Sequence, residues 1–338
     1  MSKLIVVVGA TGTQGGSVVD TFLQESGWQV RALTRNANSA AAEKLRTKGV
    51  HEVVSASLDD PASLVQAFQG ATAIFSVTDF WGAYYDPATT PEATATGLPK
   101  NVWVGQKEEQ QGKNVFDAAA QTQGLQRLIF SGLSNATKWS RGKYTHVYHF
   151  DSKARAAEYG QVTYPDLWQK TSIIQVGFYL SNVLTYPFMR PQKDADGVYT
   201  FSYTGPTDGK LPLIAAEEDT GPFTKALISL PEAGKNLIAY REWMSMDEFV
   251  ALLSRTLGVK MRTKILAMDE VAASTGIWGS LPEDLLLELS DNTNYFVEFG
   301  YEGRDDPSVL HPHALGVEVK LPSVEDWIKK QDWSAILN

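Results

Sequence analysis

One stretch near the N-terminus constrains the fold more than any other, because it joins a buried strand to a glycine turn and a helix start. The four consecutive β-branched residues 5–8 predict a central strand of a parallel sheet that is covered on both faces. Gly9 allows a tight turn, Gly12 lets the backbone approach a pyrophosphate, and Gly15 lets a helix pack closely on the strand. A helix that begins near Thr13 then points free N–H groups and its positive dipole end at the phosphates. The stretch therefore predicts a dinucleotide pocket, and a turn that binds nothing is the alternative.

The end of the next predicted strand indicates which dinucleotide fits. Residues 28–33 form an apolar run that is followed by Thr34 and Arg35. A site for NAD places an acidic residue about 20 residues beyond the last glycine, where this chain has a cation. The guanidinium of Arg35 can bind the oxygens of a 2′-phosphate in a bidentate manner, which favours NADP(H). A solvated arginine at a strand end is the alternative.

Strands and helices alternate along the first half of the chain. Beyond residue 33, the expected elements are helix 39–48, strand 52–55, helix 61–68, strand 73–77, helix 105–122 and strand 127–130. This repeated β-α-β pattern predicts an α/β fold, a Rossmann-type doubly wound parallel sheet. Such sheets bind ligands at the carboxyl ends of their strands, where this chain has Ser57, Thr78 and Ser131. We expect a long loop from Phe80 to Asn101 to leave the fourth strand beside the cofactor.

The regular alternation ends near Tyr179, where shorter pieces separated by prolines begin. We therefore expect residues 1–178 to form the dinucleotide-binding domain. Residues 179–338 are expected to form a smaller C-terminal substrate or lid region over the rim of the sheet, from which the chain can cross back to the sheet. Later helices are expected at 245–257, 268–275, 282–289 and 323–330.

Composition excludes several classes of protein. The net charge of −9 and the lack of a basic run argue against direct binding to nucleic acid or to an anionic membrane surface. Without cysteine, disulfides, thiol catalysis and cysteine metal sites are excluded. The N-terminus resembles no signal peptide, and no apolar run reaches the roughly 18 residues of a membrane span. We expect a globular, cytoplasmic protein.

Motifs spread over nearly the whole chain resemble those of the NmrA-like family, an atypical branch of the short-chain dehydrogenase/reductase superfamily. They lie at residues 9–17, 31–35, 75–81, 111–114, 131–133, 149–153, 177–182 and 219–221. The resemblance is greatest to a branch of the family that contains a redox-sensing NADP(H) binder. It implies a Rossmann-type domain that prefers NADP(H), together with a small α/β C-terminal domain.

The same resemblance implies which residues bind the cofactor. By this similarity, Gln14 and Gly15 of the glycine loop hold the pyrophosphate, Arg35 holds the 2′-phosphate, and residues 77–80 border the ribose. Ser57 stands where the family often has aspartate, which weakens a hydrogen bond to the adenine. The expected cofactor residues, with the last three at the nicotinamide end, are Gly9, Thr11, Gly12, Thr13, Gln14, Gly15, Arg35, Ser57, Val77, Thr78, Phe80, Ser131, Lys153, Phe178 and Asn182.

The catalytic pattern of the superfamily is altered in this chain. Reduction of a carbonyl needs a proton donor, which the superfamily usually supplies from Tyr-x-x-x-Lys on one helix face. Here His149 stands four residues before Lys153, and Tyr148 stands five before it. Residues five apart diverge by about 140° on a helix, so Tyr148 can reach Lys153 only if the helix begins later, near Phe150. His149 is the other candidate donor, since a free imidazole exchanges protons near neutral pH, and a structural histidine is the alternative.

Two functions remain open from the sequence. Aromatic residues crowd the expected pocket and suit a small hydrophobic or aromatic substrate, which favours an NADPH-dependent reductase of a carbonyl, imine or activated alkene. The retained Lys153 also favours an enzyme. The missing Tyr-x-x-x-Lys favours a non-catalytic NADP(H) redox sensor that binds a protein partner such as a transcription regulator. No metal is expected, because His311 and His313 have no further ligands at useful spacing.

Overall fold

The main layer of the molecule is a parallel sheet. A computed structural model describes residues 2–267, 270–271 and 278–337. Eight strands lie in the order β14-β11-β6-β5-β4-β1-β2-β3, and all neighbours are parallel. The strands are β1 (Lys3–Val7), β2 (Trp28–Thr34), β3 (Glu52–Ser55), β4 (Ala73–Ser76), β5 (Arg127–Gly132), β6 (Thr171–Val176), β11 (Asn236–Ala239) and β14 (Val309–Leu310). The order 3-2-1-4-5-6 within this sheet confirms the expected Rossmann-type fold.

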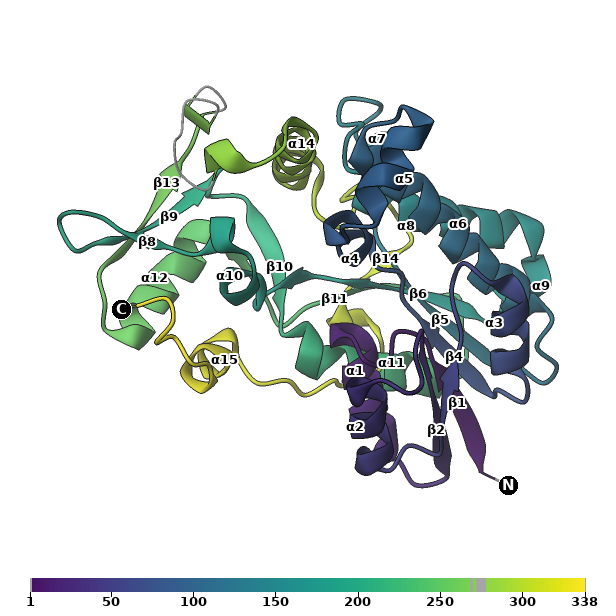
Figure 1. The fold of residues 1–338 in the computed structure, drawn as a ribbon. Coiled ribbons are helices and arrows are strands. Elements are labelled where there is room, and N and C mark those ends of the chain that lie inside the picture. Colours follow the sequence, from purple (N-terminus) through teal and green to yellow (C-terminus); the bar gives the residue numbers. More distant parts are fainter. Residues whose placement is uncertain (1, 268–269, 272–277, 338) are drawn as a thin grey trace.

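Helices cover both faces of the sheet (Figure 1). One face packs against α1 (Thr13–Leu23), α2 (Ala40–Lys48) and α11 (Ala216–Ser229). The other packs against α3 (Pro61–Phe68), α6 (Lys100–Ala120), α8 (Tyr148–Thr163) and α9 (Pro165–Trp168). Strand β1 is central: Ile5 and Val7 point into the first layer, while Val6 and Val8 point into the second. Both faces of the strand are buried along the β-branched run at residues 5–8, as expected of a central parallel strand.

A second lobe lies beside the sheet (Figure 1). It contains two three-stranded sheets, β12-β10-β7 and β13-β9-β8. Its strands are β7 (Phe178–Tyr179), β8 (Gln192–Lys193), β9 (Tyr199–Tyr203), β10 (Lys210–Ile214), β12 (Glu242–Ser245) and β13 (Met261–Ile265), and its helices include α10 (Asn182–Thr185), α12 (Met246–Leu257), α14 (Glu283–Phe299) and α15 (Val324–Lys330). Between these pieces the chain crosses back to the large sheet, to which it adds α11, β11 and β14.

Helix α14 joins the second lobe to the first. Its acidic residues Asp284, Glu288, Asp291 and Glu298 are spaced three, four or seven positions apart, so they share one face of the helix. All four accept hydrogen bonds from residues of the first lobe. Asp284 accepts from Tyr84 and Asn101, Glu288 from His149, Asp291 from His146, and Glu298 from Lys143 and Tyr144.

The segment after β4 differs from the expected local structure. The long loop expected from Phe80 to Asn101 was wrong, because it contains the helices α4 (Phe80–Tyr85) and α5 (Thr89–Thr96). The Asp79 carboxylate caps α4 by accepting the N–H of Gly82 at 2.8 Å, and local capping of this kind offsets a composition that is typical of loops. The helix expected at 268–275 lies, apart from residues 270–271, outside the described residues.

Candidate functional site

The glycine turn after β1 is shaped by contacts within the turn itself. Gly9 has a φ of +70°, which favours glycine. A Cβ on Gly15 would overlap the carbonyl oxygen and carbon of Gly9, so a side chain at position 15 would displace the turn. Helix α1 begins at Thr13, and its N-cap Gly12 has no side chain to cap it. The helix therefore presents backbone N–H groups at a turn that carries no side chains at Gly9, Gly12 and Gly15, an arrangement suited to a phosphate.

Several buried polar atoms around this turn lack a hydrogen-bond partner among the described residues. The Oε1 of Gln14 and the Oγ1 of Thr78 are both in this group. The Nε2 of Gln14 donates a hydrogen bond of 2.5 Å to the hydroxyl of Tyr179. Val77 packs directly on the turn, since a Cβ on Gly9 would lie 2.9 Å from its Cγ1. Buried polar groups are normally paired, so these unpartnered atoms beside the glycine turn fit a polar ligand such as a dinucleotide.

Arg35 follows β2 and is exposed. Its guanidinium forms no ion pair within the part of the chain that the structure describes. The hydroxyl of Ser55 donates to the Arg35 carbonyl at 3.0 Å and so fixes the backbone there. Ser57, after β3, accepts a hydrogen bond of 3.2 Å from the Asp59 N–H. The arginine is thus held at the carboxyl edge of the sheet with its charge free for an anion.

Helix α8 begins at Tyr148, so the condition under which Tyr148 could swing toward Lys153 is not met. Its side chain packs instead against α6, where a Cβ on Gly105 would lie 3.1 Å from the Tyr148 Cβ. Burial, followed by the nearby Glu288 carboxylate, raises the pKa of Tyr148. Tyr148 is therefore a weaker acid than a free tyrosine.

Lys153 is buried, with 8% of its surface exposed. Its Nζ donates hydrogen bonds to the carboxylate of Glu108 and, at 3.3 Å, to the carbonyl oxygen of His149. The hydroxyl of Ser152 donates to the second oxygen of Glu108. Glu108 lies on α6 and is almost fully buried. The lysine is thus fixed by two helices, as a group that binds and orients a ligand needs to be.

His149 lies one turn before Lys153 and is equally buried. Its Nδ1 lies 2.7 Å from Oε1 of Glu288, and the same oxygen accepts the backbone N–H of His149 at 3.2 Å. Glu288 is completely buried and belongs to α14 of the second lobe. The imidazole also lies against the ring of Trp81, with centroids 4.8 Å apart. Sequence reasoning missed both Glu288 and Glu108, although the spacing of acidic residues in the predicted helix 282–289 pointed to one polar face there.

An aromatic cluster surrounds the imidazole. We use this name for Phe80, Trp81, Tyr84, Tyr85 and Tyr186, which touch one another or His149. Burial raises the pKa of Tyr186 to about 12 and also raises the pKa of Tyr85. These hydroxyls therefore stay protonated at neutral pH, and the cluster presents uncharged rings to the site.

Three further residues that were predicted to bind the cofactor lie at the end of β5 or where the chain enters the second lobe. Phe178 and Asn182 lie on the segment that leads from the large sheet into the second lobe, and Ser131 is buried at the end of β5. Ser134, just beyond β5, is part of a structural network, because its hydroxyl donates to the Tyr301 carbonyl at 2.7 Å. Trp139 and Tyr144 pack with the core of the second lobe.

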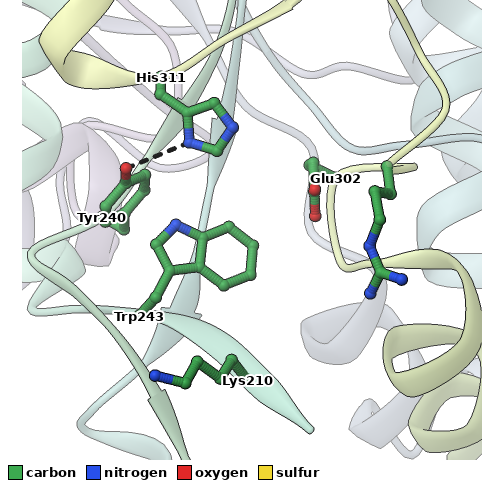
Figure 2. A pocket seen from close by; sticks show the side chains of 6 residues that line it. Lys210, Tyr240, Trp243, Glu302 and His311 are labelled. Atoms are coloured by element: carbon green, nitrogen blue, oxygen red, sulfur yellow. Dashed lines mark hydrogen bonds between the residues drawn. The ribbon is translucent and has the colours of Figure 1, made fainter.

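A separate hollow of 490 Å³ opens in the second lobe, and none of its lining residues belongs to the expected cofactor set. Figure 2 shows Tyr240, Trp243 and His311 on one side of it and Glu302 on the other. The Tyr240 hydroxyl lies 3.1 Å from Nδ1 of His311. His311 thus belongs to an aromatic wall of this hollow.

The described residues contain no group of three or more side chains suited to a metal ion. Among the described helices, none has the length and apolar character of a membrane span.

Comparison with known proteins identifies the family. The model of the NmrA-like family matches residues 1–335. The NmrA-like family domain-containing oxidoreductase hkm9 of Aspergillus hancockii is 28% identical over 351 residues, which cover 97% of each chain. The crystal structure of NmrA, a negative transcriptional regulator, has a TM-score of 0.71 at 20% identity and covers 98% of this chain and 95% of that one. The NADPH-dependent quinone oxidoreductase QOR2 of Escherichia coli, in complex with NADPH, has a TM-score of 0.65 at 19% identity, with 96% and 98% covered. The chain therefore belongs to the NmrA-like family.

Proposed function

We propose that this protein is an NADPH-dependent reductase of a small planar substrate that carries a carbonyl, an imine or an activated alkene. The observation that carries the proposal is the turn of α8 that places buried His149 against the aromatic cluster and buried Lys153 one turn beyond it, bonded to the His149 carbonyl. Two buried ionisable side chains, each held by a carboxylate, are costly to maintain in a purely structural role. The E. coli quinone oxidoreductase, which is similar in fold and complexed with NADPH, supports the same reaction class.

The chain's own residues suit the cofactor. The N-terminus of α1 would hold the pyrophosphate, Arg35 the 2′-phosphate, and Lys153 the ribose next to the nicotinamide. Phe178 and Asn182 would border the nicotinamide ring. When bound, NADPH supplies a hydride to the substrate carbon. The protein must then supply a proton and exclude water, which the buried α8 turn and the aromatic cluster favour.

His149 is the proton donor in this proposal. Its Nδ1 is bonded to Glu288, whereas its Nε2 forms no hydrogen bond with any described residue. The protonated ring can therefore donate from Nε2 to the substrate oxygen or nitrogen. The neighbouring tyrosines are poor competitors, because burial raises the pKa values of Tyr85 and Tyr148.

The test is turnover with a substrate panel. Protein and NADPH are incubated with quinones, aromatic ketones, aromatic imines and conjugated enones while the cofactor absorbance is followed. We expect turnover with at least one class, lost by about 10²- to 10⁴-fold in His149→Phe, as for removal of a general acid. Tyr148→Phe, one position away, should retain it. Absence of turnover across the panel contradicts the reductase proposal.

A non-catalytic NADP(H) sensor is the second candidate, and one observation favours it. The Lys153 ammonium is already paired with Glu108, so its engagement with a cofactor would have to compete with that ion pair. NmrA, which is similar in fold, is a negative transcriptional regulator. Tight NADPH binding by calorimetry, combined with no turnover in the substrate panel, is the result expected of a sensor.

A further inference from the structure

We propose that Glu288 is a positioning residue for proton transfer, so that the second lobe completes the active site of the first. Glu288 fixes the tautomer and the orientation of His149, which leaves Nε2 directed to the substrate. This inference rests on the proposed function, in which His149 is the proton donor. It concerns a residue in α14, far from every sequence motif of the cofactor site.

The geometry of the pair carries the inference. Oε1 of Glu288 receives two hydrogen bonds from His149, from Nδ1 at 2.7 Å and from the backbone N–H at 3.2 Å. The ring and the backbone of one residue are thus held by one carboxylate oxygen, which limits rotation of the imidazole. A carboxylate accepts hydrogen bonds and does not donate them, so Nδ1 carries a proton in the bonded state. Nε2 is then the nitrogen that exchanges its proton with the substrate.

The surroundings of Glu288 favour His149 over the neighbouring tyrosines as the proton donor. Glu288 has no exposed surface, and its Oε2 lacks a partner among the described residues. A buried carboxylate depends on the hydrogen bonds that it receives, and His149 donates to Glu288 from both its ring and its backbone. The same carboxylate adds to burial in raising the pKa values of Tyr85 and Tyr148. Glu288 therefore makes the tyrosines weaker acids while its bonded oxygen holds the imidazole of His149 in place.

The hydride and the proton that the substrate receives come from different groups. A hydride from NADPH forms the new C–H bond on the substrate carbon, and NADP⁺ results. With a carbonyl substrate, the proton on Nε2 of His149 moves to the substrate oxygen, which gives the alcohol and a neutral imidazole. The proton on Nδ1 stays in its hydrogen bond with Glu288 throughout. Solvent then restores the proton on Nε2.

The chain supplies a matched control on the same helix face. Asp291 of α14 accepts hydrogen bonds from the Nδ1 of His146 at 2.8 Å and from its backbone N–H at 3.1 Å. This pair repeats the chemistry and the helix contact of Glu288 and His149. However, the His146 ring is 38% exposed and lies outside the proposed site. Asp291→Asn thus tests the loss of a histidine–carboxylate contact between the lobes without touching the proton donor.

The experiment compares Glu288→Gln with Asp291→Asn in the full chain. We expect Glu288→Gln to lower kcat on the order of 10²-fold, because glutamine accommodates either imidazole tautomer, while the KM for NADPH is unchanged. Asp291→Asn should leave kcat unchanged. In a His149→Phe background, Glu288→Gln should cost nothing further, since residues that act as a unit are not additive. Glu288→Asp, which keeps the charge, should recover part of the activity. Equal kcat values for wild type and Glu288→Gln, or additive losses in the double variant, overturn the inference.

A second readout separates this inference from the proposed function. NMR spectra of protein with ¹⁵N-labelled histidine report which ring nitrogen carries the proton. In the neutral form we expect His149 to be protonated at Nδ1 alone in wild type and to populate the Nε2–H tautomer in Glu288→Gln. Unchanged spectra contradict the positioning role of Glu288, whether or not turnover is found. Lack of turnover in wild type contradicts only the reductase proposal.

Discussion

The side-chain amide of Gln14 donates a hydrogen bond of 2.5 Å to the hydroxyl of Tyr179, across 165 positions of sequence. Gln14 lies in the first turn of α1, beside the glycine turn, and Tyr179 lies in β7, where the chain enters the second lobe. Burial raises the pKa of Tyr179 well above its ordinary value, so the hydroxyl keeps its proton and acts as a neutral partner. The phosphate half of the proposed site is thereby tied to the segment that carries Phe178 and Asn182.

Tyr179→Phe removes the hydrogen bond between Gln14 and Tyr179. The Nε2 of Gln14 would lose the one hydrogen bond that it makes with the described residues, and a buried unsatisfied donor costs about 1–3 kcal/mol. We expect a lower free energy of unfolding in urea and weaker NADPH binding. Tyr199→Phe is the control, since its hydroxyl bonds the Leu337 carbonyl outside the site. It should lose stability with no change in NADPH affinity, and an equal loss of affinity in both variants would argue against the tie.

Gly15→Ala tests whether the turn is as crowded as the structure indicates. An alanine Cβ at position 15 would overlap the backbone of Gly9, and forced overpacking costs about 1–3 kcal/mol. The next residue is a control in the same helix, because a Cβ on Gly16 would lie 3.8 Å from its nearest neighbour. Gly16→Ala should therefore stabilise α1 by about 0.5–1 kcal/mol. In urea unfolding and NADPH titration, Gly15→Ala should lower the free energy of unfolding and the NADPH affinity, and Gly16→Ala should give the opposite result. A Gly15→Ala variant with unchanged stability and affinity would contradict the prediction.

Arg35→Ala should remove the preference for NADPH over NADH. An arginine that binds a 2′-phosphate contributes only to the phosphorylated cofactor, so NADPH affinity should fall while NADH affinity stays the same. Arg46→Ala is the control, because Arg46 is a nearby exposed cation that already pairs with Glu43. Calorimetry with both cofactors measures the effect. Equal wild-type affinities for NADPH and NADH would show that Arg35 does not select the cofactor.

Local sequence was sufficient for the glycine turn and for the family. Residues 5–15 are contiguous, so the strand, the turn and the helix start could be read from residue types alone, and the structure confirms the Rossmann-type sheet that they imply. The spacing of His149 and Lys153 also predicted a shared helix face, which α8 provides. The division at residue 178 stays a prediction, since β11 and β14 return to the first sheet.

The partners of the two buried side chains could not be predicted in the same way. Glu288 reaches His149 across 139 positions, and Glu108 reaches Lys153 across 45. Such contacts depend on how helices dock, which local periodicity does not encode. Helix α4 was missed for a different reason: its cap, Asp79, and its apolar face lie in a stretch whose composition is typical of loops.

The buried Glu302 offers a prediction about pH. Burial raises the pKa of its carboxyl, against smaller opposing effects of its own backbone and of Arg304, and its Oε2 has no partner among the described residues. At a pH below the unfolded value of about 4.3, Glu302 is protonated in both states. As the pH rises, the unfolded chain ionises first, so folding stability is lost up to the folded pKa. Glu302→Gln should therefore change the free energy of unfolding more favourably at neutral pH than in acid.

A control of opposite sign comes from Glu298. Hydrogen bonds from Lys143 and Tyr144 lower the pKa of this exposed carboxyl. Its contribution to stability is present above the unfolded pKa and is lost as the pH falls through the lower folded value. Glu298→Gln should thus destabilise the protein at neutral pH, and the difference from wild type should shrink in acid. Urea unfolding of both variants at acidic and neutral pH measures this. Because burial and pairing act in opposite directions on a carboxylate, shifts of the same sign in the two variants would contradict the account of Glu302.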